Sequence, residues 1–192
     1  MDPTPAVRIE HPDSPRGATR QFSPQVSVVA SATPAPSRPF EVIFWGGLVA
    51  GTLDAIDAMV WVTANGISIP RLFKFIASGL IGMAAFKGGA AAVALGVGLH
   101  FLIATGAAAV YYLLSLKLPR LLQKPFLSGP IFGIGAYVFM HYIVLPLSAV
   151  PPQGSPTFLW VANQLFSHIV FVGLPIALIA CRAARAPTEH LS

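Results

Sequence analysis

The stretch GGAAAVALGVGLHFLIATGAAAVYYLLSL, residues 88–116, lies between Lys87 and Lys117 and contains no acidic or basic residue. A helix needs about 20 apolar residues to cross the hydrocarbon core of a bilayer, so this stretch predicts a transmembrane helix. From Gly88 to Ala108, every fourth residue is small except for His100. Positions four apart share one helix face, and small residues let helices approach closely in lipid. We therefore expect this face, with Gly96 and His100 on it, to contact another helix.

The composition of the whole chain is typical of a membrane protein. Of its 192 residues, 55% are hydrophobic and 10% are charged, whereas an average soluble domain has about 25% charged residues. The net charge is +5, but the Lys and Arg residues flank the apolar stretches, where they set membrane orientation. We therefore expect the lipid bilayer, and not a nucleic acid, as the partner of the chain. The one cysteine, Cys181, excludes an internal disulfide and a Cys-based zinc site.

Three further apolar stretches, residues 41–64, 126–150 and 158–181, are also long enough to cross a bilayer. Residues 69–86 do not predict a span, because only 12 residues separate Lys74 from Lys87. They carry Arg71 and Lys74 on one side and apolar residues largely on the other. This pattern predicts an amphipathic interfacial helix, with a re-entrant element as the alternative. The predicted fold is all-α, an integral membrane bundle of four transmembrane helices over residues 40–182.

The two ends of the chain are predicted to lie outside this bundle. Residues 1–39 hold eight of the 18 prolines and predict a disordered tail, and residues 183–192 form a short C-terminal tail. Four spans place both termini on one side of the membrane. Lys and Arg are concentrated in the loop 117–125 and absent from the loop 151–157, which predicts cytoplasmic termini. The basic residues of segment 69–86 count against this orientation.

Two G-x-x-x-G pairs predict close helix contacts. Gly47 and Gly51 lie in the first span, and Gly129 and Gly133 lie in the third. Such pairs form faces on which two transmembrane helices approach closely. Because four spans make a thin bundle, we expect these faces to be able to support a homodimer.

Each span carries polar side chains far from its ends, and together they form a predicted polar cluster. Its members are Asp54, Asp57, His100, His141, Gln164 and His168. At about 1.5 Å per residue, the ionisable groups lie about 20–24 Å from the cytoplasmic end of their spans. Polar groups inside a bilayer are costly and normally face protein or water. The sequence therefore predicts a polar centre inside the bundle, at one level.

Three functions for this polar centre remain open. Asp–His and Gln–His hydrogen bonds can lock the bundle, the groups can relay protons or line a path for a solute, or His100, His141 and His168 can bind a metal or haem. The sequence has no H-x-x-x-H or C-x-x-C-H pattern, so no cofactor is predicted. It also lacks the G-x-S-x-G, H-E-x-x-H, P-loop and Rossmann fingerprints. We therefore expect a non-enzymatic membrane protein, with a small permeation or proton-coupled module as the first hypothesis and a structural subunit as another.

Four segments carry a resemblance to a protein family. They are RLFKFIASGLIGMAAFKGG (71–89), GLHFLIA (98–104), HYIVLPLSA (141–149) and HIVFVGLPIAL (168–178). Together they resemble a family of small bacterial integral membrane proteins of unknown function with four spans. The resemblance implies a location in the bacterial cytoplasmic (inner) membrane. It implies no reaction, cofactor or site residue.

Overall fold

The computed structural model describes residues 38–186 of the protein. All but the last two residues of the predicted N-terminal tail, and residues 187–192 of the predicted C-terminal tail, lie outside this range. The fold is therefore described for the predicted transmembrane region and its connecting segments.

Four helical stretches in this range are long and apolar enough to cross a bilayer. The first two are α1 (Pro39–Ala64) and α4 (Ala90–Lys117). The third is a continuous run of α6 (Pro125–Phe139), the π-helix η1 (Met140–Val144) and α7 (Leu145–Leu147). The fourth is a continuous run of α8 (Phe158–Ser167), the π-helix η2 (His168–Gly173) and α9 (Leu174–Arg185). The shorter helices are α2 (Ile69–Ile81), α3 (Ala84–Lys87) and α5 (Arg120–Gln123). Since residues 38–186 contain no strand, the predicted all-α bundle with four transmembrane helices is confirmed.

The observed spans begin and end within a few residues of the predicted ones. The second span begins at Ala90, because Gly88 has an extended backbone with a ψ of 150°. The third span ends at Leu147, because Ser148 is extended with a ψ of 170°. The fourth span continues past its predicted end to Arg185, so the last helix includes the first residues of the predicted C-terminal tail.

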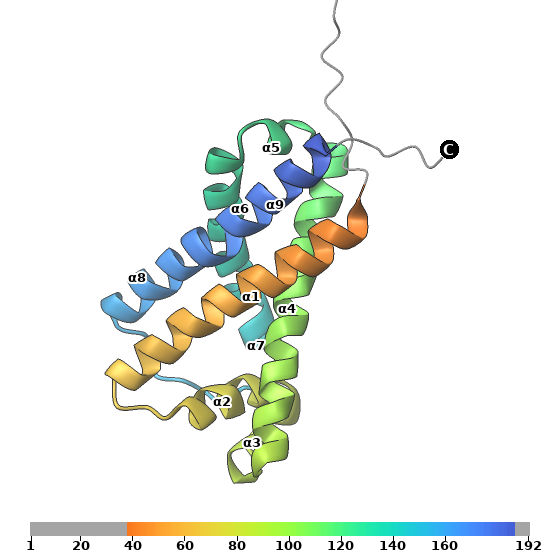
Figure 1. Ribbon diagram of the computed structural model, residues 1–192. Helices are drawn as coiled ribbons and strands as arrows, with labels where there is room; N and C mark the ends of the chain where they lie inside the picture. The colour runs from red at the N-terminus through yellow and green to blue at the C-terminus, as the bar shows by residue number, and fades with distance from the viewer. Residues whose placement is uncertain (1–37, 187–192) are drawn as a thin grey trace, which may run out of the picture. The chain divides into compact units, whose positions relative to one another are not determined.

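Figure 1 shows which elements lie at each end of the bundle. The start of α1, helix α5 and the end of α9 lie at one end of the bundle, and α2 and α3 lie at the other. Helix α1 packs against α4, α9 and η2, and α6 packs against η2 and α9. The fourth span is therefore in contact with both α1 and α6 through η2 and α9.

Gly47 and Gly51 place α1 directly against α4. A Cβ added at Gly47 would lie 2.5 Å from the hydroxyl oxygen of Thr105, and one at Gly51 would lie 2.8 Å from a ring carbon of Phe101. Side chains at these two positions would force the helices apart, so glycine is needed for the observed packing. The first G-x-x-x-G pair thus contacts another helix of the same chain.

Gly129 and Gly133 place α6 against the fourth span in the same way. A Cβ at Gly129 would lie 2.8 Å from the Cα of Leu174, and one at Gly133 would overlap the backbone carbonyl oxygen of His168. Both G-x-x-x-G faces are therefore covered by helices of the same chain. A homodimer would need a different surface from the one that the sequence indicated.

The predicted interfacial helix is divided into α2 and α3 at Gly82, whose φ of +60° is in the left-handed region that favours glycine. Helix α2 packs closely against α4, where the Cα of Gly96 faces the backbone of Phe73. The carbonyl oxygen of Gly79 accepts a hydrogen bond of 2.9 Å from the Ala149 N–H. Helix α2 is thus attached both to α4 and to the segment that follows α7.

Both π-helical segments come immediately before a Leu-Pro pair. Pro146 follows η1 and Pro175 follows η2, each at the second position of the next helix. Proline has no N–H to donate, and its ring clashes with the carbonyl one turn back. In both places the backbone changes to the wider i→i+5 pattern before the proline, so that the N–H of Leu145 bonds to the Met140 oxygen. Such π segments are frequent at functional sites.

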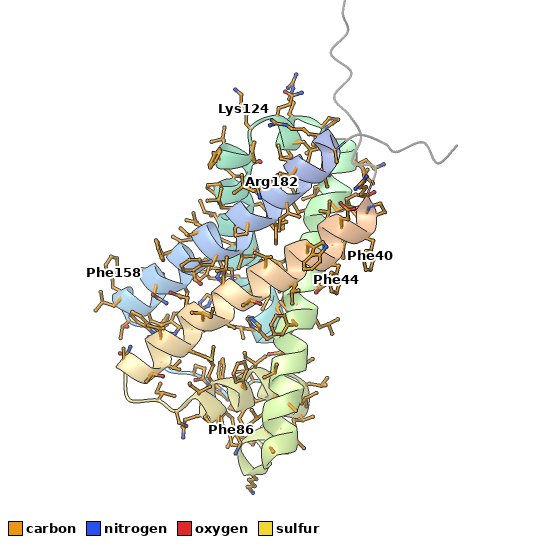
Figure 2. The ribbon with its side chains drawn as sticks, in the orientation of Figure 1. Phe40, Phe44, Phe86, Lys124, Phe158 and Arg182 are labelled. Atoms are coloured by element: carbon orange, nitrogen blue, oxygen red, sulfur yellow. The ribbon has the colours of Figure 1, made fainter. Side chains whose placement is uncertain are left out.

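Large apolar side chains cover the outer surface of the spans. Phe40, Phe126 and Phe158 are 73%, 74% and 82% exposed, and Figure 2 shows Phe40, Phe44 and Phe158 on the outside of the bundle. Extensive exposed apolar surface is rare on soluble monomers. In contact with lipid this surface is not unfavourable, because lipid tails are as apolar as these side chains.

Candidate functional site

The two intramembrane carboxyl groups lie one turn apart on α1 and are both hydrogen-bonded to the fourth span. The Ser167 hydroxyl donates to Oδ1 of Asp54 at 2.6 Å, and the Asn163 amide nitrogen donates to Oδ2 of Asp57 at 3.2 Å. Residues three and four apart share a helix face, so each helix presents its pair to the other. From one hydrogen bond to the other, the residue number rises along α1 and falls along α8. The two helices therefore form an antiparallel ladder with two rungs. We call Asp54, Asp57, Asn163 and Ser167 the carboxyl ladder.

The carboxyl ladder contains no cation. Within residues 38–186, the ion pair that the structure shows is Arg38 with Glu41, at 2.9 Å and at the start of α1. Neither Asp54 nor Asp57 has a Lys, Arg or His nitrogen within 4 Å in this part of the chain. A charged carboxylate in the hydrocarbon region is costly without such a partner, by ~2.5 kcal/mol or more. The ladder therefore offers the two carboxyl groups only neutral hydrogen-bond donors. A carboxylate here still needs a proton or a cation to neutralise its charge.

His100 joins α4 to the α1 face that carries the ladder. Its Nε2 lies 2.8 Å from the carbonyl oxygen of Gly51, and since a carbonyl can only accept, Nε2 carries the proton and donates. Gly51 is one helical turn before Asp54, so this hydrogen bond lies one turn from the ladder along α1. This contact is possible because Gly51 has no side chain to hold α4 away.

His168 and His141 both contact the ring of Tyr137. The His168 ring meets the Tyr137 ring edge-on, with centroids 5.7 Å apart, and its Nδ1 donates to the Gln164 carbonyl oxygen at 2.8 Å. The His141 ring is stacked on that of Tyr137, with centroids 5.6 Å apart and an interplanar angle of 10°. Its centroid also lies 5.7 Å from that of Trp160. The two histidines are thus connected through an aromatic ring and not by a hydrogen bond.

His141 is the histidine whose polar atoms are least satisfied. Its Nδ1 is buried and has no hydrogen-bond partner within the described residues. A buried polar atom without a partner costs about 1–3 kcal/mol when it is a donor. In the tautomer with the proton on Nε2, Nδ1 has a free lone pair, and no N–H is buried without a partner at this atom.

The predicted cluster is therefore divided into parts. The two Asp residues belong to the α1–α8 contact, His100 to the α4–α1 contact, and His141 and His168 to the aromatic group around Tyr137. In residues 38–186 no Asp carboxyl is hydrogen-bonded to a His ring, and Gln164 contributes its backbone oxygen to His168. The same residues include no group of three His, Cys, Asp or Glu side chains placed to hold one metal ion.

Four residues of these groups were not among the predicted site residues: Asn163, Ser167, Tyr137 and Trp160. The signal for two of them was present in the sequence. Asn163 and Ser167 are four apart on the fourth span, which is the spacing needed to meet two carboxyls one turn apart on an antiparallel helix. Nothing in the sequence indicates that the Tyr137 ring contacts both histidines.

Comparison with known proteins adds no assignment to this geometry. No family model, curated protein or solved structure matches the chain. The functional interpretation therefore depends on the contacts of the described residues themselves.

The contribution of the ladder to stability can be measured at its shorter rung. Ser167→Ala removes the donor from Asp54, and we expect a loss of about 0.6–1.7 kcal/mol, the usual range for side-chain hydrogen bonds between membrane helices. Ser115→Ala is the matched control, because Ser115 is equally buried but donates only to the Tyr112 carbonyl of its own helix. Unfolding of both variants in the same detergent provides the comparison. Equal losses in the two variants would show that the rung between α1 and α8 adds nothing.

Proposed function

We propose that this multi-pass membrane protein is a small proton-coupled module in which Asp54 and Asp57 bind and release protons. The observation that carries the proposal is the carboxyl ladder. It places two carboxyl groups far inside a membrane span with hydroxyl and amide donors and, among residues 38–186, no cationic partner. Ionisable groups in this situation typically belong to proton relays or ion pathways.

The partners in the ladder suit a group that changes protonation state. A serine hydroxyl can donate to a carboxylate and, after rotation, accept from a carboxylic acid. An Asn side chain offers both a donor and an acceptor in the same way. A Lys or Arg partner would instead fix the carboxylate in its charged form. Ser167 and Asn163 therefore permit both forms of the carboxyl groups without breaking the α1–α8 contact.

The location proposed for this module is the bacterial inner membrane, with both termini in the cytoplasm. The family resemblance supports the membrane, and the distribution of basic residues supports the orientation. Lys117, Arg120, Lys124, Arg182 and Arg185 gather at the end of the bundle where α5 and the end of α9 lie. Three basic residues of α2 and α3 lie at the opposite end, so the difference between the two ends is modest.

Proton movement can be tested in liposomes that contain the purified protein and a pH-sensitive dye. With a pH gradient and a potassium diffusion potential imposed, we expect wild-type protein to carry protons, and Asp54→Asn to fall to the rate of empty liposomes. Asn keeps the size of the side chain and can accept from Ser167, but it cannot bind the proton. Glu41→Gln is the control, because Glu41 is a carboxyl on the same helix that pairs with Arg38 outside the ladder.

Two results would contradict the proposal. The first is that liposomes with wild-type protein are no more permeable to protons than empty ones under gradients of both directions, which is the result expected if the ladder only holds α1 and α8 together. The second is that Asp54→Asn carries protons as fast as wild type and Glu41→Gln. In the second case the flux would not pass through the ladder.

A further inference from the structure

A basic groove lies at the end of the bundle, between α9 and the beginning of α6. Its volume is about 550 Å³, and it is lined by the cationic side chains of Lys124, Arg182 and Arg185 and by apolar side chains that include Phe126, Leu127 and Leu178. Figure 2 shows Lys124 and Arg182 at this end. Cationic groups and apolar groups thus line one hollow at the edge of a membrane span.

The position of Lys124 is fixed by a small buried network beneath it. The Ser128 hydroxyl donates to the Leu121 carbonyl oxygen at 2.7 Å and lies 3.1 Å from that of Lys124. The hydroxyl of the fully buried Tyr111 is 2.9 Å from the Ser128 oxygen. These contacts attach the turn around α5 to α4 and α6, and so fix the backbone of Lys124, which lines the groove together with α9.

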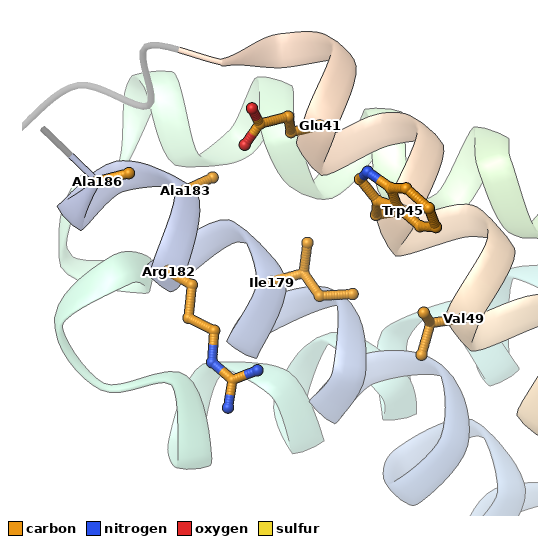
Figure 3. Close-up of a pocket in the computed structure, with 7 residues that line it drawn as sticks. All are labelled: Glu41, Trp45, Val49, Ile179, Arg182, Ala183 and Ala186. Carbon is orange, nitrogen blue, oxygen red and sulfur yellow. The ribbon is translucent and has the colours of Figure 1, made fainter. Parts of the chain in front are cut away.

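The cations of the groove have no carboxylate partner in the described chain. Residues 38–186 contain three acidic residues, Glu41, Asp54 and Asp57, and none of them forms an ion pair with Lys124, Arg182 or Arg185. Glu41 lines a separate hollow between α1 and α9 together with Arg182. Figure 3 shows that the guanidinium of Arg182 points away from Glu41. The positive charge of the groove is therefore available to a ligand.

We propose that the basic groove binds an anionic phospholipid, with the lipid phosphate between the three cations and an acyl chain against Leu127 and Leu178. Basic pockets between transmembrane helices bind anionic headgroups in this manner. The apolar wall continues onto the exposed surface of α6, where Phe126 is 74% exposed. A free phosphate ion would use the cations but would gain nothing from this wall. The start of α6 adds the positive end of its helix dipole to the same wall.

Native mass spectrometry of the full chain in a neutral detergent provides the test. We expect retention of dioleoyl phosphatidylglycerol in preference to dioleoyl phosphatidylcholine, with one lipid bound at low lipid concentration. The triple variant Lys124→Gln, Arg182→Gln, Arg185→Gln should weaken phosphatidylglycerol binding by about fivefold for each cation removed. The control Arg71→Gln, Lys74→Gln, Lys87→Gln removes the same charge from α2 and α3 at the opposite end and should change binding less than twofold.

Three outcomes would overturn the proposal. The first is an equal loss of phosphatidylglycerol by the two triple variants, which would indicate attraction by net charge alone. The second is equal retention of the two lipids by wild type. The third is displacement of the lipid by millimolar inorganic phosphate, which would make the groove a site for free phosphate. A thermal melt in the same detergent ensures that the groove variant is folded, and the single variant Arg185→Gln, with its smaller expected loss of about fivefold, replaces it if it is not.

Discussion

Gly133→Ala is expected to destabilise the protein by about 3 kcal/mol or more, whereas Gly135→Ala on the same helix is expected to be neutral or slightly stabilising. A Cβ at position 133 would overlap the carbonyl oxygen of His168 and lie 2.8 Å from the Cα of Ile169. These are backbone atoms, so no change of rotamer can relieve the overlap. A Cβ at position 135 meets nothing within 4 Å, and alanine favours a helix more than glycine does.

Thermal unfolding in mild detergent measures the difference, and light scattering of the same samples measures the mass. We expect a lower Tm for Gly133→Ala than for Gly135→Ala, with the same mass for wild type and for any folded variant. If Gly133 acted instead in a homodimer, the mass of the variant would be halved while its Tm stayed near that of wild type. That result would contradict the packing of α6 against the fourth span.

The glycine spacing shows how far the sequence could predict this packing. A G-x-x-x-G pair predicts that another helix packs closely, but the pattern is the same whether that helix belongs to the same chain or to another copy. The partner of Gly133 is the backbone of His168, which has no side-chain signature. Composition and apolar length sufficed for the number of spans, since these depend only on local hydrophobicity.

The candidate site was predictable to a similar extent. Asp54 and Asp57 are evident in the sequence, because charged residues are rare inside an apolar stretch. Their donors, Asn163 and Ser167, carry no charge, and pairing them required the register of α1 against α8. The π segments at His141 and His168 depend on how the helix backbone accommodates Pro146 and Pro175. Hydropathy contains no information on that choice.

Gly96→Ala is expected to displace α2 from α4, and it has the second largest expected effect. A Cβ at position 96 would overlap the carbonyl oxygen of Phe73, and its carbonyl carbon would be 2.6 Å away. Gly98 is two residues along the same helix, and a Cβ there meets nothing within 4 Å. Helix α2 is short and is attached through this contact and through the Ala149–Gly79 hydrogen bond. We therefore expect it to move before the four spans separate, at a cost of about 1–3 kcal/mol.

Cysteine accessibility distinguishes displacement of α2 from general unfolding. Ser78 is fully buried in α2. In a Cys181→Ala background, Ser78→Cys therefore places one thiol at a buried position of this helix. We expect this thiol to react slowly with a membrane-impermeant maleimide in the protein with Gly96 and Gly98 unchanged and in the Gly98→Ala variant. In the Gly96→Ala variant we expect it to react about tenfold or more faster, since 1.4 kcal/mol corresponds to a tenfold change in the open population. Equal protection in all three proteins would mean that α2 does not depend on Gly96. Fast labelling in all three would mean that α2 is not held against α4 at all, and the end of the bundle opposite the basic groove would then be open.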